Sequence, residues 1–208
     1  GLARREKRRA TPFSPEEILS AWTARLLRNA SKLHSKISPR PLDAEFVAPL
    51  AAHWIALNQS REVGAAAIKL ELEADRQLTG LEIDRNRIRK RRVLKEAILM
   101  QLPFGTCGSV PVITTDGIRV PDIAWSIDRD YAWTPSPHPR FQAPDLWIDV
   151  VADKPLLART KRRHTALFLA GAIECWVCGP SGKMTFHSPE GTMWRSQVCP
   201  MFPLAIPD

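Results

Sequence analysis

The sequence predicts an α/β fold in which a mixed β-sheet is flanked by helices and follows an N-terminal helical extension. Apolar residues recur at helical spacing through the first third of the chain. After Gly80, short apolar runs typical of buried strands alternate with two amphipathic helical segments. Such an order indicates helices packed on a sheet. With 208 residues, 44% of them hydrophobic, the chain can bury one core and a small helical appendage.

The N-terminal part is expected to be helical. Residues 1–12 read as a flexible basic arm, and residues 13–79 as a helical extension or subdomain. Ser14 begins a first helix, because the segment SPEEI provides an N-cap, a proline at the first helical position and a capping glutamate. Asp43 can cap a second helix, and the charged, alanine-rich stretch 61–78 is the third expected helix.

Two tryptophans indicate how these helices pack. Trp22 and Trp54 lie on apolar helix faces and should be mostly buried. One interpretation is an appended subdomain that contacts DNA or a protein partner. The other, with equal weight, is that the helices simply cover one face of the sheet.

The remaining residues, 80–208, form the predicted main domain. A short strand and turn are expected at 81–88, an amphipathic helix at 89–102 and another helix at about 156–170. A proline-rich loop spans 134–144. The expected strands lie near residues 110–114, 118–127, 145–151, 173–178, 183–187 and 193–199.

The overall charge favours a polyanionic partner. Thirty Lys and Arg residues against 22 Asp and Glu give a net charge of +8. Nucleic acid is the first expectation, and a basic protein without such a partner is the alternative. No apolar run is long enough for a membrane span, and no secretory signal follows the basic N-terminus. Four cysteines do not make a disulfide framework, so a reducing cytoplasm is expected. Cys175 and Cys178 should point to opposite faces of a strand, which disfavours a metal site there.

Three aspartates lie in or beside predicted buried strands. Asp122 follows proline in VPDIAWSI, and Asp145 does so in APDLWIDVV, which also contains Asp149. Buried carboxylates are costly unless a cation compensates them, and adjacent strands can direct them at one Mg²⁺ ion. Without a cation the pair should repel, so removing either acid would raise stability. Alternatively, an Asp after Pro can be a turn residue, an explanation that is weakest for Asp149.

The ordered segments IRVPDIAWSI, APDLWIDVV and TKRRHTALFLAGAIECWV resemble the bacterial Uma-two family of restriction-endonuclease-like proteins, within the PD-(D/E)xK nuclease superfamily. The resemblance covers about residues 81–208. It implies a restriction-endonuclease-like fold and a DNA endonuclease that hydrolyses phosphodiester bonds with Mg²⁺ or Mn²⁺. A nucleic-acid-binding or assembly module with weak or no catalysis on the same fold is the alternative.

The resemblance also implies roles for single residues. Asp122 and Asp149 correspond to the metal-binding acids. Lys161 or Arg163 corresponds to the catalytic lysine, and an arginine there can act only through its charge. Asp145, or Glu96 on the preceding helix, is a candidate for a further acid.

Basic clusters at 3–9, 85–92 and 159–163 are expected to line one channel for a phosphate backbone, with little readout of bases. A homodimer or a larger protein assembly is compatible with this interpretation. The residues proposed to contact DNA are Arg89, Lys90, Arg91, Arg92, Arg162 and Arg163.

Overall fold

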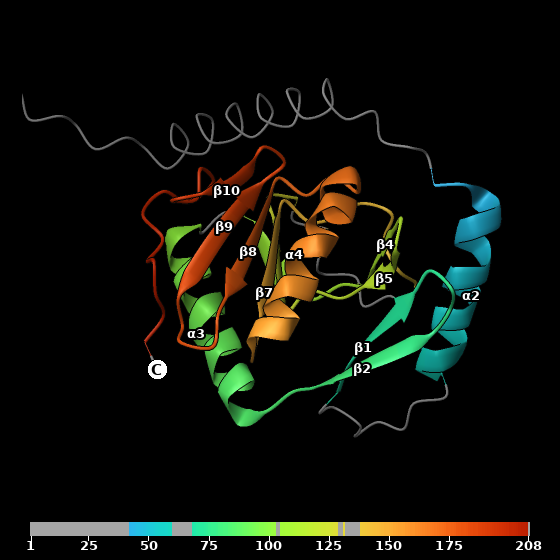
Figure 1. The fold of residues 1–208 in the computed structure, drawn as a ribbon. Coiled ribbons are helices and arrows are strands. Elements are labelled where there is room, and N and C mark those ends of the chain that lie inside the picture. The colour runs from blue at the N-terminus through green and yellow to red at the C-terminus, as the bar shows by residue number, and fades with distance from the viewer. Residues whose placement is uncertain (1–41, 60–67, 103–104, 129–130, 132–137, 208) are drawn as a thin grey trace, which may run out of the picture.

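The computed structural model describes residues 42–59, 68–102, 105–128, 131 and 138–207, and these form two sheets with helices around them (Figure 1). The smaller sheet is antiparallel throughout, in the order β2-β1-β5-β4. Its strands are β1 (Ile68–Glu73), β2 (Leu78–Glu82), β4 (Val112–Thr114) and β5 (Gly117–Arg119).

The larger sheet is mixed and has the order β10-β9-β8-β7-β6-β3. Only β7 and β8 pair in parallel, because α4 (Lys154–Leu169) provides the crossover between them. The strands are β3 (Thr106–Gly108), β6 (Ile123–Ser126), β7 (Leu146–Val150), β8 (Glu174–Cys178), β9 (Met184–Ser188) and β10 (Gly191–Met193).

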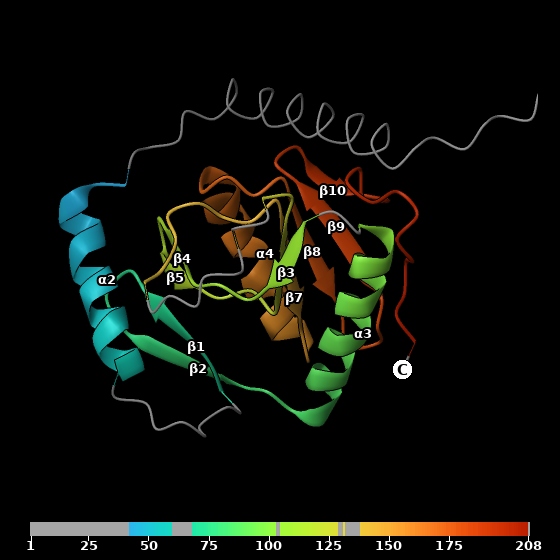
Figure 2. The ribbon, with the colours of Figure 1, turned by 180° about the vertical axis from the view of Figure 1, so that it is seen from behind.

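The two faces of the larger sheet are covered by different helices. One face packs against α3 (Arg85–Gln101) and the C-terminal segment, and its core includes Leu94, Ile148 and Trp176. The other face packs against α4, as the views from both sides show (Figures 1 and 2). Side chains alternate between the faces, so Cys178 belongs to the first core and Cys175 to the second, as predicted.

Helix α2 (Ala44–Gln59) covers the smaller sheet. Its residues Leu50 and Trp54 pack against Leu72 and Ile118. Trp54 is only 6% exposed, which confirms its predicted burial. The expected basic arm 1–12, the helix that begins at Ser14 and the side chain of Trp22 lie outside the described residues.

The prediction of a third helix at 61–78 is wrong for residues 68–78, the part of it that the structure describes. Residues 68–73 and 78–82 are the two strands of an antiparallel hairpin, and residues 60–67 lie outside the described part. The segment IKLELE alternates polar and apolar residues, and the period-two pattern outweighs the helical propensity of its Leu, Glu and Lys residues.

Two further boundaries differ from expectation. Helix α3 begins at Arg85 rather than 89, because the Asp84 side chain caps it by accepting from the Arg87 amide. The apolar run 118–127 is divided between β5 of the smaller sheet and β6 of the larger one.

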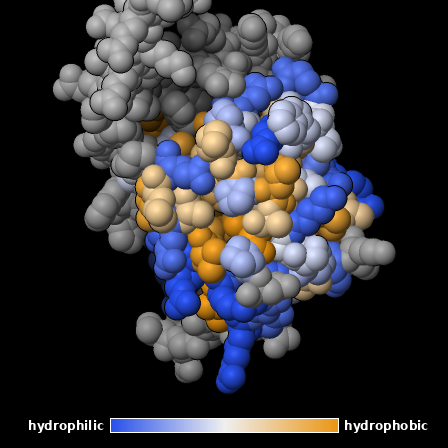
Figure 3. Space-filling model, turned by 90° about the vertical axis from the view of Figure 1, so that its left-hand side faces the viewer, coloured by the Kyte–Doolittle hydropathy of each residue, from blue (hydrophilic) through white to orange (hydrophobic). Residues whose placement is uncertain are grey.

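The predicted α/β class is confirmed: the protein is a mixed α/β structure with two sheets flanked by helices. Within the described ranges, no helix has the length and apolar character needed to cross a membrane. Figure 3 shows the face that lies at the left of Figure 1. Apolar residues gather in its middle and hydrophilic residues at its lower end, where α3 begins.

Candidate functional site

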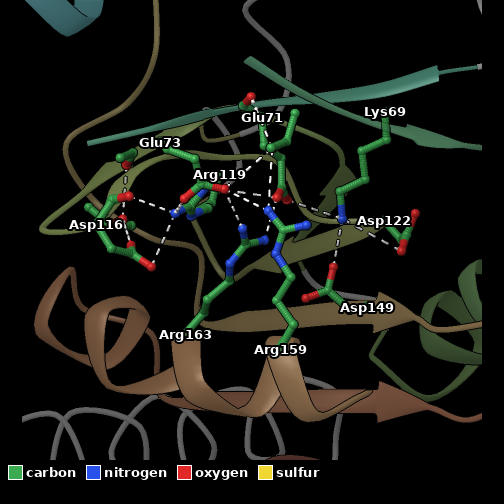
Figure 4. Close-up of polar contacts among 12 residues, drawn as sticks. Lys69, Glu71, Glu73, Asp116, Arg119, Asp122, Asp149, Arg159 and Arg163 are labelled. Carbon is green, nitrogen blue, oxygen red and sulfur yellow. Dashed lines mark hydrogen bonds and ion pairs between the residues drawn. The ribbon is translucent and has the colours of Figure 1, made fainter. Parts of the chain in front are cut away.

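Asp122 and Asp149 come together at the junction of the two sheets (Figure 4). Asp122 directly precedes β6 and Asp149 lies in the neighbouring β7, and the Asp122 amide donates to the carbonyl of Ile148. Both carboxylates face the same ammonium group. Lys69 Nζ lies 2.8 Å from Asp149 Oδ1 and 3.7 Å from Asp122 Oδ2. The structure therefore brings together the two acids that the sequence analysis paired.

Lys69 comes from β1, within the segment that was expected to be helical. Its side chain is only 7% exposed, and a third carboxylate, Glu71 Oε1, lies 3.7 Å from Nζ. Burial alone would lower the pKa of Lys69, but the charges of Asp122, Asp149 and Glu71 raise it above its usual value. Lys69 is therefore a buried cation surrounded by three carboxylates.

Arg87, from the first turn of α3, holds Asp122 from another side. Its Nε donates to Asp122 Oδ1 at 3.0 Å and its Nη2 to Oδ2 at 2.7 Å, a bidentate pair. The Val150 amide also donates to Oδ2, at 2.8 Å. Burial alone would raise the pKa of Asp122, but Lys69, Arg87 and this amide lower it. Asp122 is therefore a carboxylate with both oxygens engaged.

The second oxygen of Asp149 is engaged as well. Trp147, two residues earlier on the same face of β7, donates its Nε1–H to Asp149 Oδ2 at 2.8 Å. Asp149 Oδ1 accepts from Lys69. All four oxygens of the predicted metal-binding pair thus accept hydrogen bonds from the protein itself.

The network continues along β1 to Glu71 and Glu73. Arg163 of α4 donates to both of them, and Arg159 Nη2 donates to Glu73 at 2.6 Å. Arg119 of β5 reaches Glu73 Oε2 at 2.5 Å. Burial alone would raise the pKa of Glu73, but Arg119, Arg163 and Arg159 bring it down to about 2. The network therefore ties β1 to α4 and to β5.

A small cavity lies beside the network. Its volume is about 20 Å³, room for about one water molecule. Lys69, Arg87, Asp149, Thr160 and Arg163 are among the residues that line it. A nucleotide is much larger than this space and cannot enter it.

The two candidates for a further acid lie elsewhere. Asp145 precedes β7 and accepts from Ser126 Oγ at 2.9 Å and from the Ile127 amide at 2.8 Å, at the far end of β6 from Asp122. Four residues of strand separate it from Asp149, about 13 Å at 3.3 Å per residue. Glu96 is exposed on α3. The structure brings neither to the acid pair.

The two candidates for the lysine position form no ion pair with Asp122 or Asp149. Lys161 and its neighbour Arg162 are exposed on the surface of α4. Arg163 turns inward, but its partners are Glu71 and Glu73. The Lys161 side chain points to solvent and that of Arg163 into the protein, because side chains two residues apart on a helix do not share a face.

The basic residues of α3 divide into two groups. Arg89 and Arg92 are exposed, and the partly exposed Arg91 has its Nε 3.8 Å from Asp122 Oδ1. Lys90 is buried and donates to the main-chain carbonyls of Gly179 and Pro180. Helical rotation turns this side chain into the protein, so Lys90 differs from the exposed position expected of a residue that contacts DNA.

The metal that the family resemblance implies does not fit these residues. A divalent ion at Asp122 and Asp149 needs carboxylate oxygens as ligands, yet Lys69 lies between the two acids and Arg87 engages both oxygens of Asp122. Among the described residues, no three His, Cys, Asp or Glu side chains are arranged to hold a metal ion.

Five members of the network were not anticipated from sequence: Lys69, Glu71, Glu73, Arg87 and Arg119. A signal for the first three was present, because IKLELE places Lys69, Glu71 and Glu73 on one face of a strand and leucines on the other. No comparable signal pointed to Arg87, whose partner Asp122 lies 35 positions away.

Comparisons with known proteins complete the description. No family model matches this chain. No curated protein matches it. Among solved structures, one match is a protein from Anabaena variabilis ATCC 29413 described as a "putative nuclease belonging to DUF820", with a TM-score of 0.49 and 15% sequence identity. The match covers 67% of this chain and 82% of that protein.

Proposed function

We propose that this protein binds nucleic acid through the sugar–phosphate backbone and that its acid pair serves as a neutralised structural element instead of a metal site. The main support is the position of Lys69, which lies between Asp122 and Asp149. Since Arg87 also pairs with Asp122, these carboxylates do not repel a nearby phosphate chain.

Exposed cations of α3, beside the network, supply the proposed contact surface. Lys and Arg side chains bind phosphates independently of base sequence. Several of them lie at the start of α3, where cations oppose the helix dipole and an anionic partner would compensate them. This end of the molecule is the hydrophilic lower end in Figure 3. The exposed residues of this surface are Arg85, Arg89, Arg92 and Lys95. The exposed Lys161 and Arg162 belong to α4, which covers the opposite face of the larger sheet.

A second candidate is the metal-dependent DNA endonuclease that the family resemblance implies. The observation that favours it is the convergence of Asp122 and Asp149, from adjacent strands, on one cation. In this alternative, Lys69 leaves the acid pair when Mg²⁺ or Mn²⁺ binds, and Lys161 or Arg163 supplies positive charge. The alternative thus requires a rearrangement that the first proposal does not.

Backbone binding can be tested by fluorescence anisotropy with duplexes of different sequence over a range of salt concentrations. Affinity should not depend on sequence, and log K should fall with log[salt] with a slope of about −0.9 for each phosphate contacted. The double variant Arg89→Ser/Arg92→Ser should flatten that slope by about 2 units, one for each cation removed.

The matched control, Arg76→Asn/Arg195→Ser, removes the same charge far from the start of α3. It should leave the slope almost unchanged. Equal slopes for the wild-type protein and the α3 variant would contradict the proposed surface.

Cleavage is tested separately. Plasmid DNA incubated with the protein and Mn²⁺, with and without EDTA, is expected to stay intact. Nicking that needs Mn²⁺ and disappears in Asp149→Asn would establish the second candidate. Backbone binding would be unaffected by that outcome, because the anisotropy measurement does not depend on cleavage.

A further inference from the structure

We infer that the Lys69 ammonium takes the place of a divalent cation beside Asp122, Asp149 and Glu71, so that its removal leaves Asp149 Oδ1 and Glu71 Oε1 free to bind a metal ion. The three carboxylates lie 2.8 to 3.7 Å from Nζ, on three sides of one positive charge. This inference does not depend on the proposed binding of nucleic acid.

The ligand chemistry suits a hard cation once the ammonium is gone. Mg²⁺ and Mn²⁺ prefer carboxylate oxygens and complete their coordination with water, and the adjacent cavity has room for about one water molecule. For an ion at the position of Nζ, metal–oxygen distances near 2.1 Å require Asp149 Oδ1 to move in by about 0.7 Å and Glu71 Oε1 by about 1.6 Å. Asp149 Oδ1 and Glu71 Oε1 are the oxygens that lose the Lys69 charge most directly.

The backbone holds Lys69 in this position. Strand β1 is paired on both sides, with Lys69 opposite Leu81 of β2 and Leu72 opposite Ile118 of β5. Leu72 is fully buried in the core under α2. The ammonium cannot withdraw together with its strand unless these pairs break. Lys69 is therefore a resident counter-ion of the acid pair.

The experiment compares Mn²⁺-dependent melting of the full chain with that of two variants. Lys69→Met removes the charge and keeps an unbranched stem, whereas Lys69→Arg keeps the charge. Melting temperatures are measured in Mn²⁺ and in KCl of equal ionic strength. The melting temperature of Lys69→Met should be higher in Mn²⁺ than in KCl by about 5 °C or more, because a bound ligand stabilises the folded state. The melting temperatures of the wild-type protein and of Lys69→Arg should be the same in Mn²⁺ and in KCl.

A double variant shows where the ion binds. Lys69→Met/Asp149→Asn should lose the Mn²⁺ response, because one carboxylate of the site is gone. If Lys69→Met is insoluble alone, refolding in Mn²⁺ should recover soluble protein and refolding in KCl should not.

Two outcomes would overturn the inference. One is a wild-type protein that is stabilised by Mn²⁺ in a manner lost in Asp149→Asn, since Lys69 would then yield to metal. The other is a Lys69→Met variant that neither gains a Mn²⁺ response nor is rescued by Mn²⁺ during refolding.

Discussion

Asp122 is the most heavily bonded carboxylate of the charged network. It accepts two hydrogen bonds from Arg87 and one from the Val150 amide, and Lys69 is 3.7 Å away. Its side chain has no exposed surface. A buried ion pair gives little net stability as a whole, but removing one partner leaves the other charge buried without compensation.

We predict that Asp122→Asn lowers the free energy of unfolding by about 3 to 5 kcal/mol, because Arg87 and Lys69 lose their shared counter-charge. Urea denaturation with EDTA present measures the change. Asp75→Asn, at an exposed turn, is the matched control and should stay within about 0.5 kcal/mol of wild type. A stabilised Asp122→Asn protein would instead favour the mutual repulsion expected from sequence alone.

His164 is the second residue whose environment has a measurable consequence. It is buried in α4 with its ring 4.7 Å from that of His187. Burial, together with the neighbouring His187, lowers the pKa of His164 to about 4. The folded state therefore binds fewer protons than the unfolded state between pH 4 and the ordinary histidine pKa of 6.5.

Since the unfolded state binds more protons in that window, stability should fall as the pH is lowered from 6.5 towards 4, by up to about 3 kcal/mol from this group. His164→Leu should remove that part of the pH dependence, and the exposed His138→Gln should retain it. Urea midpoints measured at several pH values provide the test. An unchanged acid slope in His164→Leu would show that other groups cause it.

At the scale of elements, the contact between β1 and β5 joins the two parts of the chain that the sequence analysis separated. Gly117 begins β5 with a φ of +125°, directly opposite Glu73. A Cβ atom at Gly117 would lie 2.0 Å from the carbonyl oxygen of Leu72. A side chain there cannot be accommodated while the strands stay paired.

Gly117→Ala should therefore destabilise the protein by clearly more than the roughly 1–2 kcal/mol that an unfavourable positive φ costs an alanine. Gly191→Ala is the matched control, because Gly191 has a φ of +131° but nothing within 4 Å of the added Cβ. Thermal melts of the two variants separate the cost of the positive φ, which both share, from the cost of the steric clash, which only Gly117→Ala has. Equal losses would mean that β5 moves away from β1 at little cost.

At the scale of the whole molecule, α2 and the β1–β2 hairpin pack against residues of the region that follows them. They cover Ile113 and Ile118 and supply Lys69 to the acid pair. The proposed boundary between residues 79 and 80 falls inside β2, within the paired hairpin. The two parts therefore share one smaller sheet.

We predict that residues 80–208 alone do not fold, because β5 loses β1 and the acid pair loses its buried cation. Residues 42–208, which keep every contact described above, should stay soluble and melt cooperatively. Circular dichroism and the soluble fraction after expression report both results. A folded 80–208 fragment would show that the helical extension is an independent subdomain.

Much of the fold could be predicted because its signals are local. Helical periodicity predicted α2, and the apolar runs around Ile148 and Trp176 predicted β7 and β8. The pairing of Asp122 with Asp149 was also anticipated, since both lie in runs that predict neighbouring strands. Residues 68–82 form a hairpin and not the expected helix. The period-two pattern there is short, so it is a weaker signal than a long amphipathic repeat.

By itself, the sequence determined that helices and strands alternate after Gly80 and that two aspartates enter buried strands. Only the tertiary structure decided what neutralises them. Lys69 reaches Asp149 across 80 positions of sequence, through the pairing of β1 with β5. Coulomb energy depends on the distance between charges in space and on their burial. Local patterns predict burial but not the distance between charges that are far apart in the sequence, so the same two acids that predict a metal site from sequence are bound by a lysine in the folded protein.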